Sequence, residues 1–213
     1  MIRETEAPLW RGLGRLNVAG NRICTATLIS ADEVVTSAHC LFHPVTRHRA
    51  EPAEIHFVAG FWRDDYAALR HVTAIALLPD YVYTGQKVDI LALKPDLALL
   101  KLDQPISPEE AQPLKVIDWP GAPARFDIAG YGRDRPLIPS IREGCGVLAP
   151  IGPGVELDCP VVPGLSGAPV VVSGGQELAA LVSVSVGTRV KGESVIVIPL
   201  APHLAALRAL LPK

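Results

Sequence analysis

The chain has 213 residues, of which 49% are hydrophobic and 20% charged, and its net charge is −2. This composition is typical of a globular protein, and a charge so close to neutral argues against binding to nucleic acid or an anionic membrane. The sequence also lacks the ~18 consecutive apolar residues that a membrane-spanning helix needs.

Short apolar or alternating runs, which are typical of β-strands, recur along the chain and are separated by turn residues. The 18 glycines and 20 prolines fit many short strands joined by turns. In chain order, strands are predicted at residues 24–30, 33–37, 54–59, 70–77, 96–102, 114–117, 125–131, 155–159, 168–172, 177–185 and 188–199. A helical pattern is convincing only near the end, where Leu204, Leu207, Leu210 and Leu211 follow Pro202.

A polar stretch with three prolines, residues 103–113, separates these strands into two groups. We therefore predict an N-terminal unit over residues 1–108 and a C-terminal unit over residues 109–213. A cleft between two such units is a common location for an active site.

The four cysteines fall into two pairs whose members are close in the sequence, Cys24 with Cys40 and Cys145 with Cys159. Neither pair has the C-x-x-C spacing that zinc or redox sites use, so two disulfides are favoured over free thiols. Disulfides indicate an oxidising compartment. Because residues 1–6 are charged and contain no secretory signal, we expect a secreted or periplasmic protein whose signal has been removed.

His39 ends the apolar run of residues 34–38, and Cys40 beside it can tie it back to Cys24. A catalytic base needs such a rigid support, because its hydrogen-bond geometry must be held. The alternative is a histidine that is simply packed in the core. The other histidines fit that alternative or a surface position: His43, His48, His56, His71 and His203.

Asp96 opens the apolar run of residues 97–100. A carboxylate entering a buried strand is costly unless it has a hydrogen-bond partner, and an imidazole N–H is such a partner. The alternative is an aspartate at a strand edge with its charge in water. Asp89, before residues 90–93, competes for the same role, but the run after Asp96 is longer and continues into the polar stretch.

Ser166 lies between Gly164 and Gly167. Glycines allow a tight turn in which backbone N–H groups converge near the serine hydroxyl, so the amides of Gly164 and Ser166 are candidate donors to an oxyanion. A Gly-Ser turn alone is weak support, because many β-proteins contain one. Together with His39 and Asp96 it completes a set that can activate a serine nucleophile.

The segments around these residues, 36–40, 96–102 and 164–169, resemble the histidine, aspartate and serine motifs of the trypsin/chymotrypsin-like serine peptidases. The order histidine, aspartate, serine is the one that this family uses. The positions of Cys145 and Cys159 are most similar to those in the bacterial trypsin-like or glutamyl-endopeptidase-like branch. The resemblance implies an all-β fold of two six-stranded antiparallel barrels, a catalytic triad between them, and no metal or cofactor.

Two positions depart from the digestive members of the family. Leu165 stands where they carry the aspartate that pairs with a new N-terminus, so that activation switch is not supported. Pro160 stands where trypsin has its specificity aspartate, so cleavage after Lys or Arg is not implied. Ser183 and Ser185 are candidate walls of the substrate pocket and would suit a small or acidic side chain. They could equally be the alternating polar residues of an ordinary strand.

These observations predict a serine endopeptidase that cleaves proteins or peptides as a monomer, through an acyl-enzyme. The first alternative is a catalytically silent relative that binds a partner with the same fold. The second is an esterase-type hydrolase, but its usual residue order is serine, aspartate, histidine, which this chain contradicts.

Overall fold

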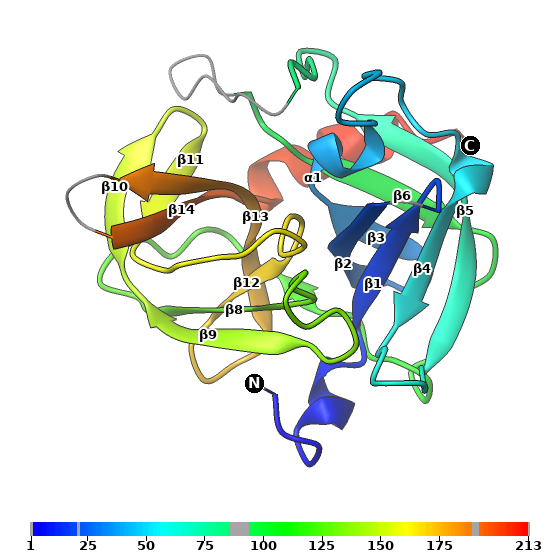
Figure 1. Ribbon diagram of the computed structural model, residues 1–213, viewed down its shortest axis with the longest axis horizontal. Helices are drawn as coiled ribbons and strands as arrows, with labels where there is room; N and C mark the ends of the chain where they lie inside the picture. The colour runs from blue at the N-terminus through cyan, green and yellow to red at the C-terminus, as the bar shows by residue number, and fades with distance from the viewer. Residues whose placement is uncertain (1, 21, 86–93, 189–191, 213) are drawn as a thin grey trace.

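A computed structural model describes the chain except residues 1, 21, 86–93, 189–191 and 213. The described residues form two β-structures that lie side by side, with a short α-helix near the C-terminus (Figure 1). The predicted all-β architecture is confirmed. None of the helices in the described ranges is long and apolar enough to cross a membrane.

The first β-structure, called here the first barrel, is a closed antiparallel barrel with the strand order β1-β2-β3-β6-β5-β4. Its strands are β1 (Leu13–Val18), β2 (Arg22–Ser30), β3 (Glu33–Thr36), β4 (Ile55–Ala59), β5 (Ala68–Leu77) and β6 (Ala98–Leu102). Short 3-10 helices precede or connect them: η1 (Ala7–Trp10), η2 (Ala38–Leu41) and η3 (Pro52–Glu54). Strand β1 was not predicted, because Gly14, Arg15 and Asn17 interrupt its apolar pattern.

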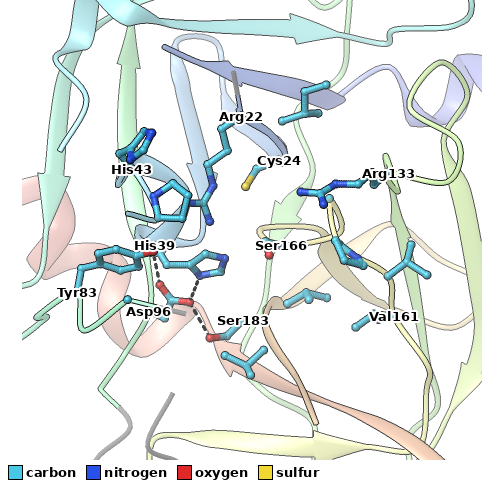
Figure 2. A pocket seen from close by; sticks show the side chains of 18 of the residues that line it. Arg22, Cys24, His39, His43, Tyr83, Asp96, Arg133, Val161, Ser166 and Ser183 are labelled. Carbon is cyan, nitrogen blue, oxygen red and sulfur yellow. Dashed lines mark hydrogen bonds and ion pairs between the residues drawn. The ribbon is translucent and has the colours of Figure 1, made fainter. Parts of the chain in front are cut away.

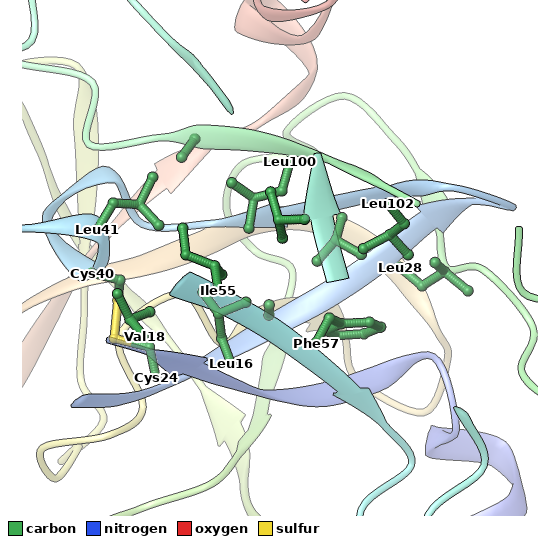
Figure 3. Packing of buried hydrophobic residues seen from close by; sticks show 14 of the residues in the cluster. Leu16, Val18, Cys24, Leu28, Cys40, Leu41, Ile55, Phe57, Leu100 and Leu102 are labelled. Carbon is green, nitrogen blue, oxygen red and sulfur yellow. A yellow bond between two sulfur atoms is a disulfide. The ribbon is translucent and has the colours of Figure 1, made fainter. Parts of the chain in front are cut away.

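Inward-facing side chains fill the first barrel (Figure 3). Leu16, Leu28, Phe57 and Leu100 are completely buried there. Burying one such side chain stabilises the fold by roughly 1.5–3 kcal/mol relative to leaving it in water. The Cys24–Cys40 disulfide belongs to the same cluster, so the segment that carries His39 is attached to a rigid core.

The second β-structure, called here the second sheet, has the strand order β10-β11-β14-β13-β12-β8-β9, and β7 pairs with β13. Its strands are β7 (Lys115–Val116), β8 (Phe126–Gly130), β9 (Ser140–Cys145), β10 (Val147–Ile151), β11 (Gly154–Leu157), β12 (Pro169–Val172), β13 (Glu177–Thr188) and β14 (Gly192–Pro199).

The second sheet differs in detail from the closed six-stranded barrel that the resemblance implied. It is a curled sheet whose two edge strands, β9 and β10, are consecutive in the chain and meet at Gly146. If β9 and β10 are taken as one bent strand, the main path contains the expected six strands. The sequence did not predict β9 or β10, because Gly144, Gly146 and Pro150 break the apolar pattern.

The C-terminal helix α1 (Ala201–Ala209) follows β14 and packs on β5 and β6 of the first barrel. It buries Leu207, whereas Leu210 lies just past its end and is 45% exposed. The polar stretch 103–113 also packs on the first barrel, since Ile106 and Ala111 join its core. The boundary at residue 108 stays a prediction.

Candidate active site

A cavity of about 800 Å³ lies between the first barrel and the second sheet (Figure 2). Each β-structure contributes part of its wall. The lining residues are 22–24, 39, 43–45, 81–85, 94, 96, 131–133, 136, 161–164, 166 and 182–184. We call this cavity the site pocket. His39, Asp96, Gly164, Ser166 and Ser183, all predicted as site residues, line it.

The pairing of two strands brings His39 and Asp96 together. Strand β3 ends at Thr36, which lies opposite Ala98 at the start of β6. His39 therefore follows one strand and Asp96 precedes the other at the same end of the barrel. The Nδ1 atom of His39 lies 2.6 Å from Oδ2 of Asp96, and the His39 backbone N–H donates to Oδ1 at 2.8 Å.

Asp96 is almost completely buried, with 4% of its surface exposed. Its Oδ2 atom also accepts a hydrogen bond from the Ser183 hydroxyl at 2.7 Å. Burial by itself raises the pKa of the Asp96 carboxyl, but the charge of His39 and the hydrogen bonds from His39 and Ser183 outweigh it. The pKa of Asp96 is therefore lowered, and the carboxylate stays ionised beside the imidazole.

Tyr81 borders the same carboxylate. Burial raises the pKa of its phenol, and the charge of Asp96 and a hydrogen bond to it raise the pKa further. The phenol thus stays neutral, and its ring lies against Phe42, with the ring centroids 6.1 Å apart. Tyr81 is therefore a further neutral hydrogen-bond partner of the buried Asp96 carboxylate.

Ser166 lies in a tight turn, residues 164–167, which we call the serine turn. Gly164 has φ +100° and Gly167 has φ +77°. Residues other than glycine rarely adopt such positive φ angles. A Cβ atom on Gly167 would lie 2.2 Å from Oγ1 of Thr36, and one on Gly164 would lie 2.5 Å from the carbonyl oxygen of Tyr131. Both glycines are therefore required by close packing as well as by conformation.

The serine turn leaves its polar groups available on the pocket side. Within the described part of the chain, neither the Gly164 amide, the Ser166 amide nor the Ser166 hydroxyl donates a hydrogen bond. Figure 2 shows the His39 ring and the Ser166 side chain facing each other across the pocket. No hydrogen bond joins these two side chains within the described contacts. Catalytic hydrogen bonds often form only when substrate binds, so the arrangement is compatible with proton transfer.

Thr25, a residue of β2 that was not among the predicted site residues, links the serine turn to the first barrel. Its backbone N–H donates to the carbonyl of Ser166 at 3.0 Å, and its hydroxyl donates to the carbonyl of Gly164 at 3.0 Å. The same hydroxyl accepts the N–H of Tyr131 at 3.0 Å. A buried threonine in a strand carries no sequence signal for such a role, apart from its place next to Cys24.

Two more hydrogen bonds meet at the carbonyl of Val182, and one of them joins the two β-structures. The Ser37 hydroxyl donates to the carbonyl of Val182 at 2.6 Å, and the Gly167 amide donates to the same carbonyl at 2.9 Å. These contacts fix the segment that carries His39 relative to the serine turn.

The part of the site pocket next to Ser166, called here the recess, includes residues 161–163 and residues 182–184 of β13 in its lining. Ser183 belongs to this lining, but its hydroxyl is bonded to Asp96. Ser185 also lies in β13, and its side chain is outside the part that the structure describes. The competing residue Asp89 lies outside the described residues as well. Leu165 is buried in the hydrophobic core of the second sheet, in the same cluster as Phe126 and Val170.

The structure contains both predicted disulfides, Cys24–Cys40 and Cys145–Cys159. The first attaches the His39 segment to β2. The second joins the end of β9 to the loop before the serine turn.

Comparisons with known proteins agree with this geometry. The sequence model of the Trypsin family matches residues 2–143. No curated protein matches the chain by sequence.

Many solved structures share the fold, and two examples are peptidases of similar length. One is a Glu endopeptidase determined in complex with MPD, with 15% identity and a TM-score of 0.78, covering 98% of this chain and 94% of that chain. The other is a thermostable serine protease, AL20, from an extremophilic microorganism, with 13% identity and a TM-score of 0.72, covering 95% of this chain and 98% of that chain. These similarities establish the chymotrypsin-like fold that the motifs implied.

Proposed function

The chain belongs to the trypsin family, and on that basis we propose that it is a serine endopeptidase that hydrolyses peptide bonds through an acyl-enzyme. The observation that carries the proposal is the His39–Asp96 pair facing Ser166, with Ser166 set in a turn where the amides of Gly164 and Ser166 donate no hydrogen bond to any described residue. Membership of a peptidase family makes peptides or proteins the substrate class.

In the proposed mechanism, Oγ of Ser166 attacks the carbonyl carbon of the scissile bond while Nε2 of His39 takes its proton. Asp96 holds the imidazole so that Nδ1 carries a proton and Nε2 is free to accept one, and it stabilises the imidazolium that forms. His39 then donates the proton to the leaving amine, and the acyl group stays on Ser166. Water, deprotonated by His39, releases it in a second round of the same steps.

The amides of Gly164 and Ser166 are the proposed donors to the oxyanion. Negative charge develops on the substrate oxygen only as Oγ bonds to the carbonyl carbon, so these donors bind the transition state more strongly than the substrate. Removing one donor of this type costs about 10²–10³ in kcat in an established case.

For the residue before the scissile bond, we infer a compact side chain. The recess beside Ser166 is bordered largely by apolar side chains, Val161, Val162, Val182 and Val184, and within its described lining no carboxylate faces it that would select Lys or Arg. A glutamate side chain at this position would require a hydrogen-bond donor, and the Ser183 hydroxyl is already bonded to Asp96. Mapping cleavage sites in a peptide library by mass spectrometry tests this inference.

Two disulfides fit an extracellular location, and we propose that the protein is secreted or periplasmic. Thiol counting on protein isolated from its native host tests this: no free thiol is expected. Four free thiols would contradict it.

The test of the catalytic proposal is labelling with a fluorophosphonate probe, followed by intact-mass analysis and peptide mapping. We expect one adduct, on Ser166, that is lost in Ser166→Ala and strongly slowed in His39→Ala. Ser173→Ala, which removes a serine hydroxyl bonded to Asp127 away from the pocket, is the control and should label normally. A folded protein without an adduct would favour the alternative, a silent relative that binds a partner.

A further inference from the structure

The charged residues that line the site pocket are unevenly distributed in sign. Arg22, Lys94 and Arg133 are cationic, whereas Asp96 is the one acidic residue in the described lining. Asp96 is buried and paired with His39, so it presents no free negative charge to the pocket. The chain as a whole has a net charge of −2, so this cationic lining is a local feature and does not reflect the overall composition.

Two of these cations, Arg22 and Arg133, lie on either side of Cys24 (Figure 2). Arg22 is half-buried, and its Nη1 atom donates to the carbonyl oxygen of Phe42 at 2.6 Å, which fixes the guanidinium in place. Arg133 is exposed, and its side chain makes no hydrogen bond or ion pair with any other described residue. Lys94 is less available, because its Nζ lies 3.9 Å from Oδ2 of Asp80.

The backbone N–H of Arg133 donates to the carbonyl of Pro163 in the recess wall, but the guanidinium groups of Arg22 and Arg133 lie on the Cys24 side of the pocket, away from Val161 (Figure 2). That recess is formed by residues 161–163 and 182–184, whereas Arg22 and Arg133 flank the pocket wall at Cys24. If the recess takes the side chain before the scissile bond, the peptide that follows the bond crosses the wall at Cys24. Its side chains then pass between the two guanidinium groups.

We propose that Arg22 and Arg133 select substrates with Asp or Glu among the first three residues after the scissile bond. This inference rests on the proposed endopeptidase function and names the substrate class. A guanidinium group binds a carboxylate with two parallel hydrogen bonds, and Arg133 has its donors free for this purpose. Because the pair forms at a partly exposed position, its contribution is modest and decreases as salt screens the charges.

The test uses internally quenched peptides from a mapped cleavage site, identical before the bond and carrying either Glu or Gln at the second and third positions after it. For the unmodified protein we expect kcat/KM to favour the Glu peptide by about tenfold at low ionic strength, and less at high salt. Arg22→Gln and Arg133→Gln should each reduce this preference about threefold. Arg133→Lys should retain part of the preference for the Glu peptide. Arg133→Glu should disfavour the Glu peptide, because its carboxylate repels the acidic side chain.

Arg142→Gln is the matched control, because Arg142 lies in β9, does not line the pocket, and bonds the carbonyl of Ile141. It should leave the preference unchanged. Equal turnover of both peptides, or a preference that neither Arg22→Gln nor Arg133→Gln alters, would overturn the proposal. So would a preference for acidic residues that is confined to positions before the bond. Circular dichroism of each variant verifies that it is folded.

A failure of the endopeptidase proposal gives a different result: no peptide is cleaved in a Ser166-dependent manner. In that event the affinities of Ser166→Ala for the Glu and Gln peptides, measured by calorimetry, test the arginines alone. Tighter binding of the Glu peptide that is lost in Ser166→Ala/Arg133→Gln supports their role. Equal affinities overturn it.

Discussion

The two sides of the site pocket are held by different means. On the first barrel, Asp96 is buried and its carboxylate accepts hydrogen bonds from the His39 ring, the His39 backbone and Ser183. On the second sheet, the serine turn is held by close packing around Gly164 and Gly167 and by hydrogen bonds from Thr25. The amides of Gly164 and Ser166 and the Ser166 hydroxyl donate no hydrogen bond to any described residue. One side is organised by charge, and the other by conformation.

This difference follows from the roles proposed for the two sides. A base must keep one orientation through the whole reaction, so fixed hydrogen bonds around it are useful. Oxyanion donors must stay unbonded until charge develops on the substrate, so only the backbone can hold them in place. Substitutions on the two sides should therefore have different consequences.

The largest effect is expected from changing the charge at Asp96. Asp96→Asn should lower kcat about 10⁴-fold, the size of the effect when this carboxylate is replaced in an established triad, because the imidazole takes the wrong tautomer. Steady-state kinetics on a peptide substrate measure it. Asp127→Asn is the control, since Asp127 is another buried carboxylate that bonds the Gly144 amide and Ser173, away from the pocket. Similar losses in both variants would contradict the assignment.

Removing either disulfide should lower the stability of the fold, but only the loss of Cys24–Cys40 should also lower activity. Replacing either pair with alanines should lower the free energy of unfolding by about 2–4 kcal/mol, because each cross-link closes a loop of similar length. Urea unfolding measures this. Removing Cys24–Cys40 should also reduce kcat, since it releases the segment that carries His39.

Under conditions where both disulfide variants are folded, a kcat loss of the same size in each would argue against a special role for the Cys24–Cys40 support.

On the serine-turn side, Thr25→Val should lower kcat about tenfold with little change in KM. Its hydroxyl bonds the Gly164 carbonyl and the Tyr131 amide, and losing one hydrogen-bonded group there leaves buried polar atoms unpaired. A turn that is less well fixed should bind the oxyanion less well, so affinity for a peptide boronic acid should fall in parallel with kcat.

Thr25→Ser, which keeps the hydroxyl, should restore most of the activity. A Thr25→Val enzyme with normal kcat and normal boronic acid affinity would show that packing alone holds the serine turn.

The smallest effect concerns stability in acid. The pKa of Asp96 is lowered in the folded protein, so the unfolded chain binds its proton first as the pH falls. The stabilisation by this carboxylate is therefore complete above about pH 4, the ordinary range for an aspartate, and is lost as the pH decreases through the lower pKa of the folded state. The difference in unfolding free energy between the unmodified protein and Asp96→Asn should shrink below pH 4.

Urea unfolding at a series of pH values between 6 and 2.5 provides the measurement. A difference that stays constant over this range, or that grows toward acid pH, would contradict a lowered pKa for Asp96.

The strands that the sequence predicted well are those with continuous apolar character. The apolar runs before Thr36 and after Asp96 are paired strands of the first barrel. Burial of their apolar side chains is the main free-energy gain when these segments fold. Strands β1, β9 and β10 were missed, since glycine, proline and polar residues interrupt their patterns and only neighbouring strands stabilise them. The run 188–199 was predicted as one strand, and the structure begins β14 at Gly192.

Local sequence by itself determined the main candidate residues, because His39, Asp96 and Ser166 each require a distinctive neighbourhood: a supported strand end, an apolar run, and flanking glycines. Only the tertiary structure decided how they are held. The hydroxyl of Ser183 turned toward Asp96, Thr25 became the link to the serine turn, and Arg22 and Arg133 came to flank Cys24. These contacts join residues far apart in the chain, and a hydrogen bond or charge pair across such a distance leaves no periodic pattern in the sequence.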